Sequence, residues 1–148
     1  MDRLKTLFED YIAYAGKLRE ETASVKSVLG LRDREIYDAG HKAFDTAVEE
    51  WVQAFARKQP PQRELVEALE YILFTALDYE EKAPFWYLTA VQRHTKLLIP
   101  LLADNSRKAL LAEFEIRYPA GRRLPMQKEL YRLLNKEDKK EKRFFLFR

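Results

Sequence analysis

Two histidines, His41 and His94, are the first residues to consider for metal or acid–base chemistry. A carboxylate-bridged metal site in a helical bundle requires Glu-x-x-His pairs from two different helices. The nearest match in this chain is Asp38-x-x-His41, because His94 has Val91 at the equivalent offset. One half of the motif without the other favours a His41 ring on a solvated helix flank, beside Asp38 and Asp45. For His94 we expect a partly buried ring that is hydrogen bonded to a backbone or tyrosine group.

Other catalytic and metal-binding patterns are weak or missing in the sequence. Glu67-x-x-Glu70 and Asp78-x-x-Glu81 have the outline of carboxylate pairs that hold Mg²⁺, but both lie on one predicted helix, which favours a solvated acidic face. The chain has no cysteine, which excludes thiolate metal sites, disulfides and thiol catalysis. It has no glycine-rich phosphate loop and no Gly-x-Ser-x-Gly motif. We therefore predict no catalytic residue, no metal ligand and no cofactor, and we favour a non-enzymatic protein.

Basic residues gather in the last third of the chain. Residues 1–91 hold 12 Lys and Arg against 17 Asp and Glu, a net charge of −5, whereas residues 92–148 hold 15 against 7, a net of +8. Guanidinium groups beside the free N–H groups of a helix N-terminus can bind phosphate. The candidate phosphate-binding residues share one ridge of the last predicted helix, its C-terminal continuation or the loop before it: Arg122, Arg123, Lys128, Arg132, Lys136, Lys139 and Arg143. An ordinary solvated face is the alternative that this pattern leaves open.

Large aromatic side chains away from the predicted core are the other candidates for binding. Trp86 lies off the inward face of its helix, whereas Trp51 belongs with the core. Tyr71 and Phe74 lie opposite a core stripe, so they are either covered by another element, as we expect, or exposed for a partner. The chain closes with three phenylalanines after a charged spacer, and we expect this tail to dock on its own domain. The candidate partner-binding residues are Trp86, Tyr71, Phe74, Phe144, Phe145 and Phe147.

Helices are the elements that must position these residues. Apolar residues recur at spacings of three and four, the breakers Gly and Pro are sparse, and no hairpin-type turn is present. The spacing predicts six helices, with N-caps at Asp33 and Asp104. The first runs from about 2 to the region 23–27, the next four span about 33–58, 61–81, 84–102 and 105–118, and the last spans about 125–136 or longer. Pro100 should kink or end the fourth helix, because proline removes a backbone donor and clashes one turn back.

The second predicted helix has two apolar strips, and together they indicate a central position. One strip is small (Ala39, Gly40, Ala43, Ala47 and Ala54) and the other is bulky (Tyr37, Phe44, Val48, Trp51 and Phe55). A small strip allows a neighbouring helix to approach closely, and a bulky strip fills a wider gap. We therefore expect this helix to contact at least two others at the centre of the molecule.

The sequence as a whole predicts an all-α protein, built as a single-domain bundle or short stack of five to six helices. The domain should span 1–136, and 137–148 should be a charged C-terminal extension ending in the aromatic tail. We expect a cytoplasmic protein, because no segment resembles a signal peptide or a membrane span. The favoured function is a macromolecule-binding module, with a protein partner ahead of nucleic acid bound through the basic ridge and the Arg122-Arg123 loop. The identity of the partner and the oligomeric state stay open.

Overall fold

Helices form where the apolar periodicity predicts them. The structure is a computed structural model that describes the backbone of residues 1–24, 30–80 and 82–136, and side chains within these ranges except those of 22–24 and 30–38. The α-helices are α1 (Asp2–Ser24), α2 (Gly30–Arg57), α3 (Gln62–Phe74), α4 (Tyr87–Ala90), α5 (Asp104–Arg117) and α6 (Pro125–Leu134). Short 3₁₀-helices join them: η1 (Thr75–Tyr79), η2 (Ala83–Phe85), η3 (Val91–Leu97), η4 (Ile99–Leu101) and η5 (Ala120–Arg122). The described residues contain no strand, so the all-α prediction is confirmed.

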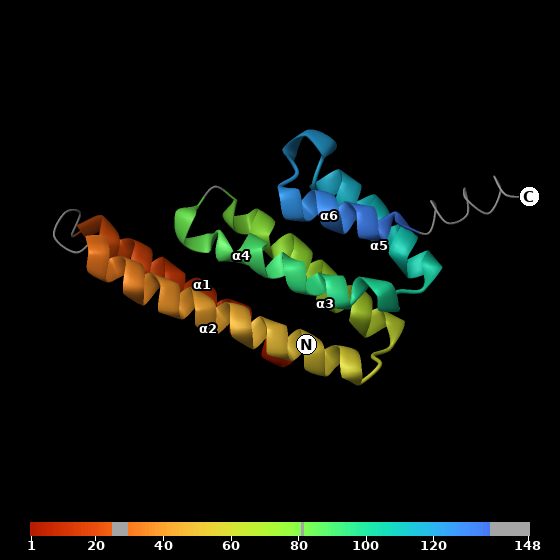
Figure 1. Cartoon of the computed structure of the whole chain (residues 1–148), viewed down its shortest axis with the longest axis horizontal. Coiled ribbons are helices and arrows are strands. Elements are labelled where there is room, and N and C mark those ends of the chain that lie inside the picture. Colours follow the sequence, from red (N-terminus) through yellow and green to blue (C-terminus); the bar gives the residue numbers. More distant parts are fainter. Residues whose placement is uncertain (25–29, 81, 137–148) are drawn as a thin grey trace, which may run out of the picture.

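The helices pair into three successive antiparallel hairpins that lie side by side (Figure 1). The first hairpin is α1 with α2, the second is α3 with the segment from α4 to η4, and the third is α5 with α6. Helix α2 contacts η3 from one side and α6 contacts η3 from the other, so the second hairpin is the middle layer. One hydrophobic cluster runs through all three layers, from Phe8 on α1 to Phe114 on α5 and Leu134 on α6.

Helix α2 departs from its prediction in three ways. It begins at Gly30 and not after Asp33, and it lies in the outer first hairpin and not at the centre. Ala39, Ala43 and Ala54 of the small strip are exposed, so the prediction that they are buried is wrong, whereas Gly40 and Ala47 are half-buried. The bulky residues occupy the buried face because apolar burial grows with side-chain area, which leaves alanine, a strong helix former, for the solvent side. That face is lined by His41, Phe44, Val48 and Val52, with Trp51 packed at its edge.

The fourth predicted helix forms mostly as tighter turns. Its predicted inward residues Leu88, Val91, Thr95 and Leu98 are fully buried, but the backbone runs as η2, α4, η3 and η4. Side chains donate to carbonyls three residues back, with Thr89 Oγ1 to Trp86 O at 2.5 Å and Thr95 Oγ1 to Gln92 O at 2.6 Å. Such bonds compete with the regular α-helical pattern. The segment ends at Leu101, directly after Pro100, as proline predicts.

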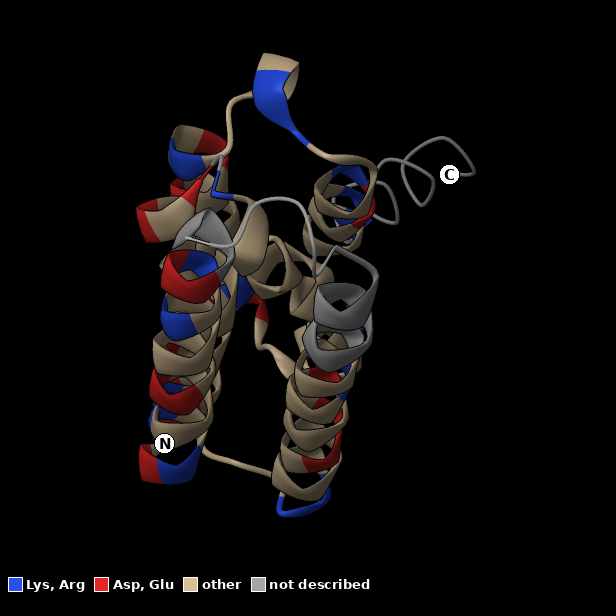
Figure 2. Cartoon of the chain, turned by 90° about the vertical axis from the view of Figure 1, so that its left-hand side faces the viewer, with Lys and Arg blue, Asp and Glu red and all other residues tan. Residues whose placement is uncertain are grey.

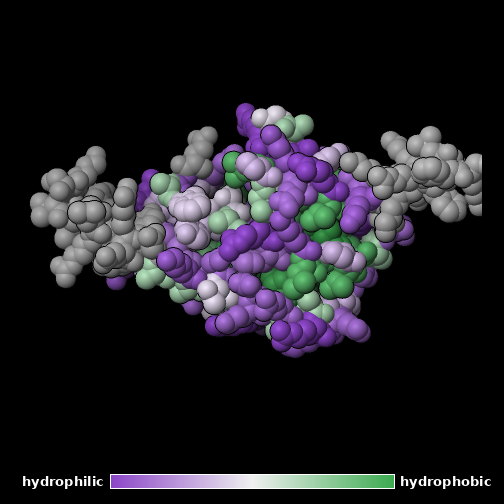
Figure 3. Space-filling model, in the orientation of Figure 1, coloured by the Kyte–Doolittle hydropathy of each residue, from purple (hydrophilic) through white to green (hydrophobic). Residues whose placement is uncertain are grey.

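The face drawn in Figure 3 is mostly hydrophilic, and Figure 2 shows residues of both charges distributed along the helices. The loop that carries η5 projects between α5 and α6 at the top of Figures 1 and 2, and it is basic. An apolar patch interrupts the face seen in Figure 3, where η3 and η4 cross the molecule, and Leu97 and Leu101 of these segments are exposed. Among the described residues, no helix combines the length and the apolarity that crossing a membrane requires.

Candidate functional site

A groove of about 670 Å³ opens between η1, η2 and the turn from α5 to α6. Three apolar side chains surround it that are unusually exposed for their type: Trp86 at 54%, Ile116 at 79% and Leu124 at 48%. They come from three segments: Trp86 caps η2, Ile116 lies in the last turn of α5, and Leu124 precedes α6. We call this the Trp86 groove. It gathers apolar area that ordinary folding would bury.

Cations outnumber anions at the rim of the Trp86 groove. Lys82, Arg117 and Arg122 line it, against the single described carboxylate of Glu80. Arg117 is partly committed elsewhere, because it pairs with Glu113 at 3.3 Å and lies over the Phe74 ring at 5.1 Å from its centroid. The excess of positive charge favours a ligand that carries carboxylates next to its apolar groups.

A buried polar network forms the floor of the groove. Gln92 Nε2 donates to Leu73 O at 2.9 Å and to Tyr118 Oη at 3.0 Å, and Gln127 Nε2 donates to Gln92 Oε1 at 3.2 Å. The Tyr118 hydroxyl also donates to Leu73 O. Burial raises the pKa of Tyr118 to about 12, although the hydrogen bond from Gln92 acts in the opposite direction. The network is therefore uncharged at neutral pH and holds α3, η3, α5 and α6 in fixed positions beneath the groove.

The predicted aromatic residues are found in different environments. Trp86 lies at the groove, exposed and packed on Tyr87 with ring centroids 4.1 Å apart. Phe74 is buried beneath Arg117 and against Tyr118, so its ring belongs to the core and cannot serve as a surface for a partner. Tyr71 is half-buried, and its ring packs against the Phe8 ring with ring centroids 5.0 Å apart. Residues Phe144, Phe145 and Phe147 lie outside the described residues.

The predicted basic ridge is only partly available to a phosphate. Lys128 and Arg132 are exposed on α6, Lys136 is exposed just beyond its end, and Arg122 is exposed at the Trp86 groove. Arg123 already makes contacts within the domain. Its Nε donates to Tyr118 O at 2.8 Å, and its guanidinium lies 4.2 Å from the centroid of the Tyr131 ring. Lys139 and Arg143 lie outside the described residues. The structure thus places Arg122 beside Trp86, two residues that the sequence suggested for different functions.

Both histidines differ from their predictions. The His41 ring is fully buried, stacks on Tyr87 with ring centroids 4.4 Å apart, and has Nδ1 2.7 Å from Tyr11 Oη, so the predicted solvated flank is wrong. The cause is the rotation of α2, which turns His41 onto the same face as Phe44. His94 is partly buried as expected, but its Nε2 contacts Asp45 Oδ1 at 2.9 Å, a carboxylate in place of the predicted backbone or tyrosine group.

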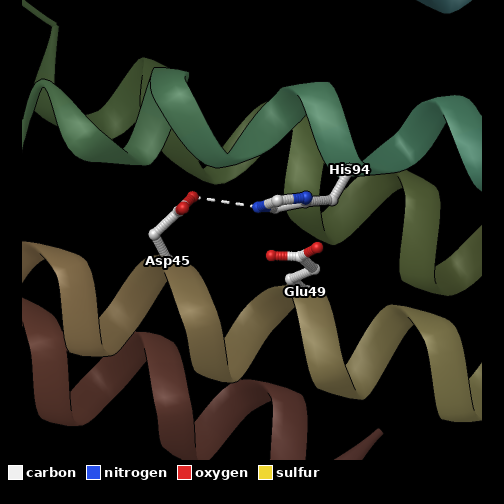
Figure 4. A group of neighbouring side chains, drawn as sticks. All are labelled: Asp45, Glu49 and His94. Atoms are coloured by element: carbon white, nitrogen blue, oxygen red, sulfur yellow. Dashed lines mark hydrogen bonds and ion pairs between the residues drawn. The ribbon is translucent and has the colours of Figure 1, made fainter.

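Asp45, Glu49 and His94 form a second cluster, between α2 and η3 (Figure 4). Ligand atoms of the three side chains all lie within 4.8 Å of one another. The sequence offered one signal for this cluster, the i,i+4 spacing of Asp45 and Glu49, but nothing that linked them to His94. Ile116 and Leu124 were missed for a similar reason, because only the turn between α5 and α6 brings them beside Trp86.

Comparison of the chain with protein-family models, with curated proteins and with solved structures finds no match in any of the three.

Proposed function

We propose that this protein is a non-enzymatic module that binds a segment of a partner protein in the Trp86 groove, and that it does so in the cytoplasm. The observation that carries the proposal is the convergence of Trp86, Ile116 and Leu124, all exposed, around one hollow. Single exposed apolar residues are ordinary on protein surfaces, but a group of them around a concave site is typical of recognition.

The partner segment is expected to be apolar with acidic flanks. Tryptophan and arginine are the residues that most often dominate binding energy at protein interfaces, and Trp86 and Arg122 supply both here. Apolar anchors of the partner would fill the hollow between Trp86 and Ile116, while its carboxylates would face Lys82 and Arg122. The fixed network beneath, through Tyr118 and Gln127, means that the floor needs little ordering when a ligand binds.

Nucleic-acid binding through α6 is the alternative, and the described contacts favour it less. Arg123, one of its predicted phosphate ligands, is already bonded to Tyr118 and stacked on Tyr131. Glu129 lies on the same helix as Lys128 and Arg132, and it pairs with Lys96 at 2.6 Å, so anionic charge interrupts the ridge. Phosphate contacts would produce binding that weakens steeply with salt. A fluorescence anisotropy titration with labelled duplex DNA and single-stranded RNA at low salt is expected to show no binding in the micromolar range.

Peptide selection tests the groove directly. A random peptide library is displayed and selected on the full chain, and the enriched peptides are labelled for anisotropy titrations. We expect enriched sequences that combine aromatic or aliphatic residues with Asp or Glu. Ile116→Ser should weaken their binding about tenfold or more, as truncation of an anchor in an interface centre does, without loss of fold because Ile116 is exposed.

The matched control is Leu97→Ser. Leu97 is also an exposed apolar residue, at 49%, but it lies on η3 and does not line the Trp86 groove. The enriched peptides should bind this variant as tightly as they bind the unmodified chain. Peptides that bind Ile116→Ser with full affinity, or that lose affinity equally with both variants, would rule out the groove as the binding site.

A further inference from the structure

Three side chains that can ligate a metal ion meet between α2 and η3, and none of them lines the Trp86 groove. Asp45 and Glu49 are four residues apart and project from successive turns on one face of α2, while His94 comes from η3. In Figure 4 the two carboxylates and the imidazole point toward one another. A donor atom from each lies within 4.8 Å of the donor atoms of the other two. The fold therefore gathers one nitrogen and two carboxylate donors around one point.

Asp45 divides its two carboxylate oxygens between two partners. Oδ1 lies 2.9 Å from His94 Nε2, and Oδ2 accepts a hydrogen bond from Arg93 Nη2. Arg93 is held in place by a second bond, from its Nη1 to the carbonyl of Ala90 at 2.9 Å. Arg93 thus orients the carboxylate from outside and leaves Oδ1 directed at the space shared with His94 and Glu49. Carboxylates that ligate metals are commonly held by such outer hydrogen bonds.

The separations suit an ion of the size of zinc. Ligand bonds of about 2.0–2.2 Å at tetrahedral angles place donor atoms roughly 3.3–3.6 Å apart. The pair of Asp45 Oδ1 and His94 Nε2, at 2.9 Å, needs only a small outward shift. The ion would replace the proton that these two atoms now share, as metal binding generally does at its ligands. Glu49 is exposed, so it can turn toward the ion and leaves a side open for entry and for a water ligand.

Burial and charge also favour a cation at this position. The side chains of His94 and Asp45 are only 10% and 18% exposed, so two of the three ligands are held in place before binding. The carboxylates of Asp45 and Glu49 against the guanidinium of Arg93 leave a net charge of −1, not counting the imidazole. We propose that Asp45, Glu49 and His94 bind one divalent cation of the zinc class. Zinc accepts mixed imidazole and carboxylate ligands, whereas Mg²⁺ and Ca²⁺ prefer sets made of oxygen alone.

The sequence predicts no metal ligand, so this site is an addition that only the structure provides. It does not depend on the proposed function of the Trp86 groove. The test is isothermal titration of the full chain, without a histidine tag, with ZnCl₂ and separately with MgCl₂. We expect one zinc ion per chain and no measurable magnesium binding. Glu49→Gln should weaken zinc binding by roughly tenfold or more. Glu50→Gln, the same change at the next exposed position of α2, should leave it unchanged.

Proton NMR supplies a second readout that a purely structural ion pair would not produce. The chain has two histidines, so the ring signals of His94 can be distinguished from those of the buried His41. Zinc is expected to shift the His94 ring signals and to leave those of His41 in place. The proposal is overturned if zinc binds without a defined stoichiometry, if Glu49→Gln and Glu50→Gln behave alike, or if the His94 signals do not move. In that case the cluster is an ion-pair network that joins α2 to η3.

Discussion

The hydroxyl of Tyr11 joins three segments that are far apart in the sequence. It lies 2.7 Å from His41 Nδ1 on α2 and donates to the carbonyl of Pro84 on η2, also at 2.7 Å. Since a hydroxyl has one proton and the Pro84 carbonyl can only accept, the arrangement that satisfies both contacts has the Nδ1–H of His41 donating to Tyr11. This assignment makes His41 a buried structural donor, which agrees with its full burial.

Replacing Tyr11 with phenylalanine removes only one oxygen atom, but it should destabilise the fold measurably. Tyr11→Phe removes the shared partner of the Pro84 carbonyl and of His41 Nδ1, both in the core, and should lower the free energy of unfolding by about 1–3 kcal/mol. Urea unfolding monitored by circular dichroism measures the change. The control is Tyr131→Phe, because the Tyr131 hydroxyl donates an exposed hydrogen bond to Glu115 Oε1 at 3.2 Å. Its loss should change the free energy of unfolding by less than about 0.5 kcal/mol. Equal stability of the two variants would show that the buried contacts contribute nothing.

At the scale of elements, the contact between α3 and α5 brings acidic residues together. Burial, and next the neighbouring carboxylate of Glu113 on α5, raise the pKa of Glu70 on α3, while Arg117 opposes this shift. A carboxyl group with a raised pKa in the folded state holds its proton more readily there than in the unfolded chain. The stability that it contributes is therefore present at low pH and is lost as the pH rises through the folded pKa.

The sign of this effect predicts that Glu70→Gln stabilises the protein near neutral pH. The gain should be below about 1 kcal/mol, because Glu70 is only partly buried and solvent screens the interaction. It should vanish below the ordinary glutamate pKa of about 4.3, where the carboxyl is neutral in both states. Thermal unfolding of the variant and of the unmodified chain across this pH range provides the measurement. If Glu70→Gln lowers the melting temperature at pH 7, the contact between the two carboxylates is not unfavourable.

For the whole molecule, the continuous core implies cooperative unfolding. Phe8 in the first hairpin and Phe114 in the third are both fully buried, and they belong to one hydrophobic cluster that passes through the middle hairpin. The buried network of Gln92, Gln127 and Tyr118 ties the middle hairpin to the third in addition. Within the described residues the hydrophobic cluster is continuous from one hairpin to the next, so no hairpin is expected to unfold alone.

Two alanine variants at opposite ends of the core test this expectation. Phe8→Ala and Phe114→Ala should each reduce the free energy of unfolding by about 3–5 kcal/mol, as loss of a buried aromatic ring does. In both variants, circular dichroism of the helices and of the aromatic side chains should report one coincident transition. A second transition, or loss of structure confined to one hairpin, would instead indicate independent units.

The sequence by itself determined the helices and most of their inward faces. The predicted and observed spans of α1, α5 and α6 agree within a few residues, whereas α3 ends at Phe74 and the rest of its predicted span winds as η1. Leu4, Phe8, Leu69, Phe114 and Leu130 are fully buried as the periodicity predicts. This part is predictable because an apolar stripe is a local property of consecutive turns. The local pattern also gave two wrong predictions of detail. Ala43 is exposed and not buried, and the region around Pro84 and Thr95 winds more tightly than an α-helix.

Only the tertiary structure decided which residues from different helices meet. It buried His41 against Tyr11, placed His94 beside Asp45 and Glu49, and brought Ile116 and Leu124 to the groove of Trp86. A sequence pattern states which face of a helix is apolar, but it does not specify how that helix is rotated and stacked on its neighbours. Sites assembled across helices depend on that rotation and stacking, and packing of the whole core sets both.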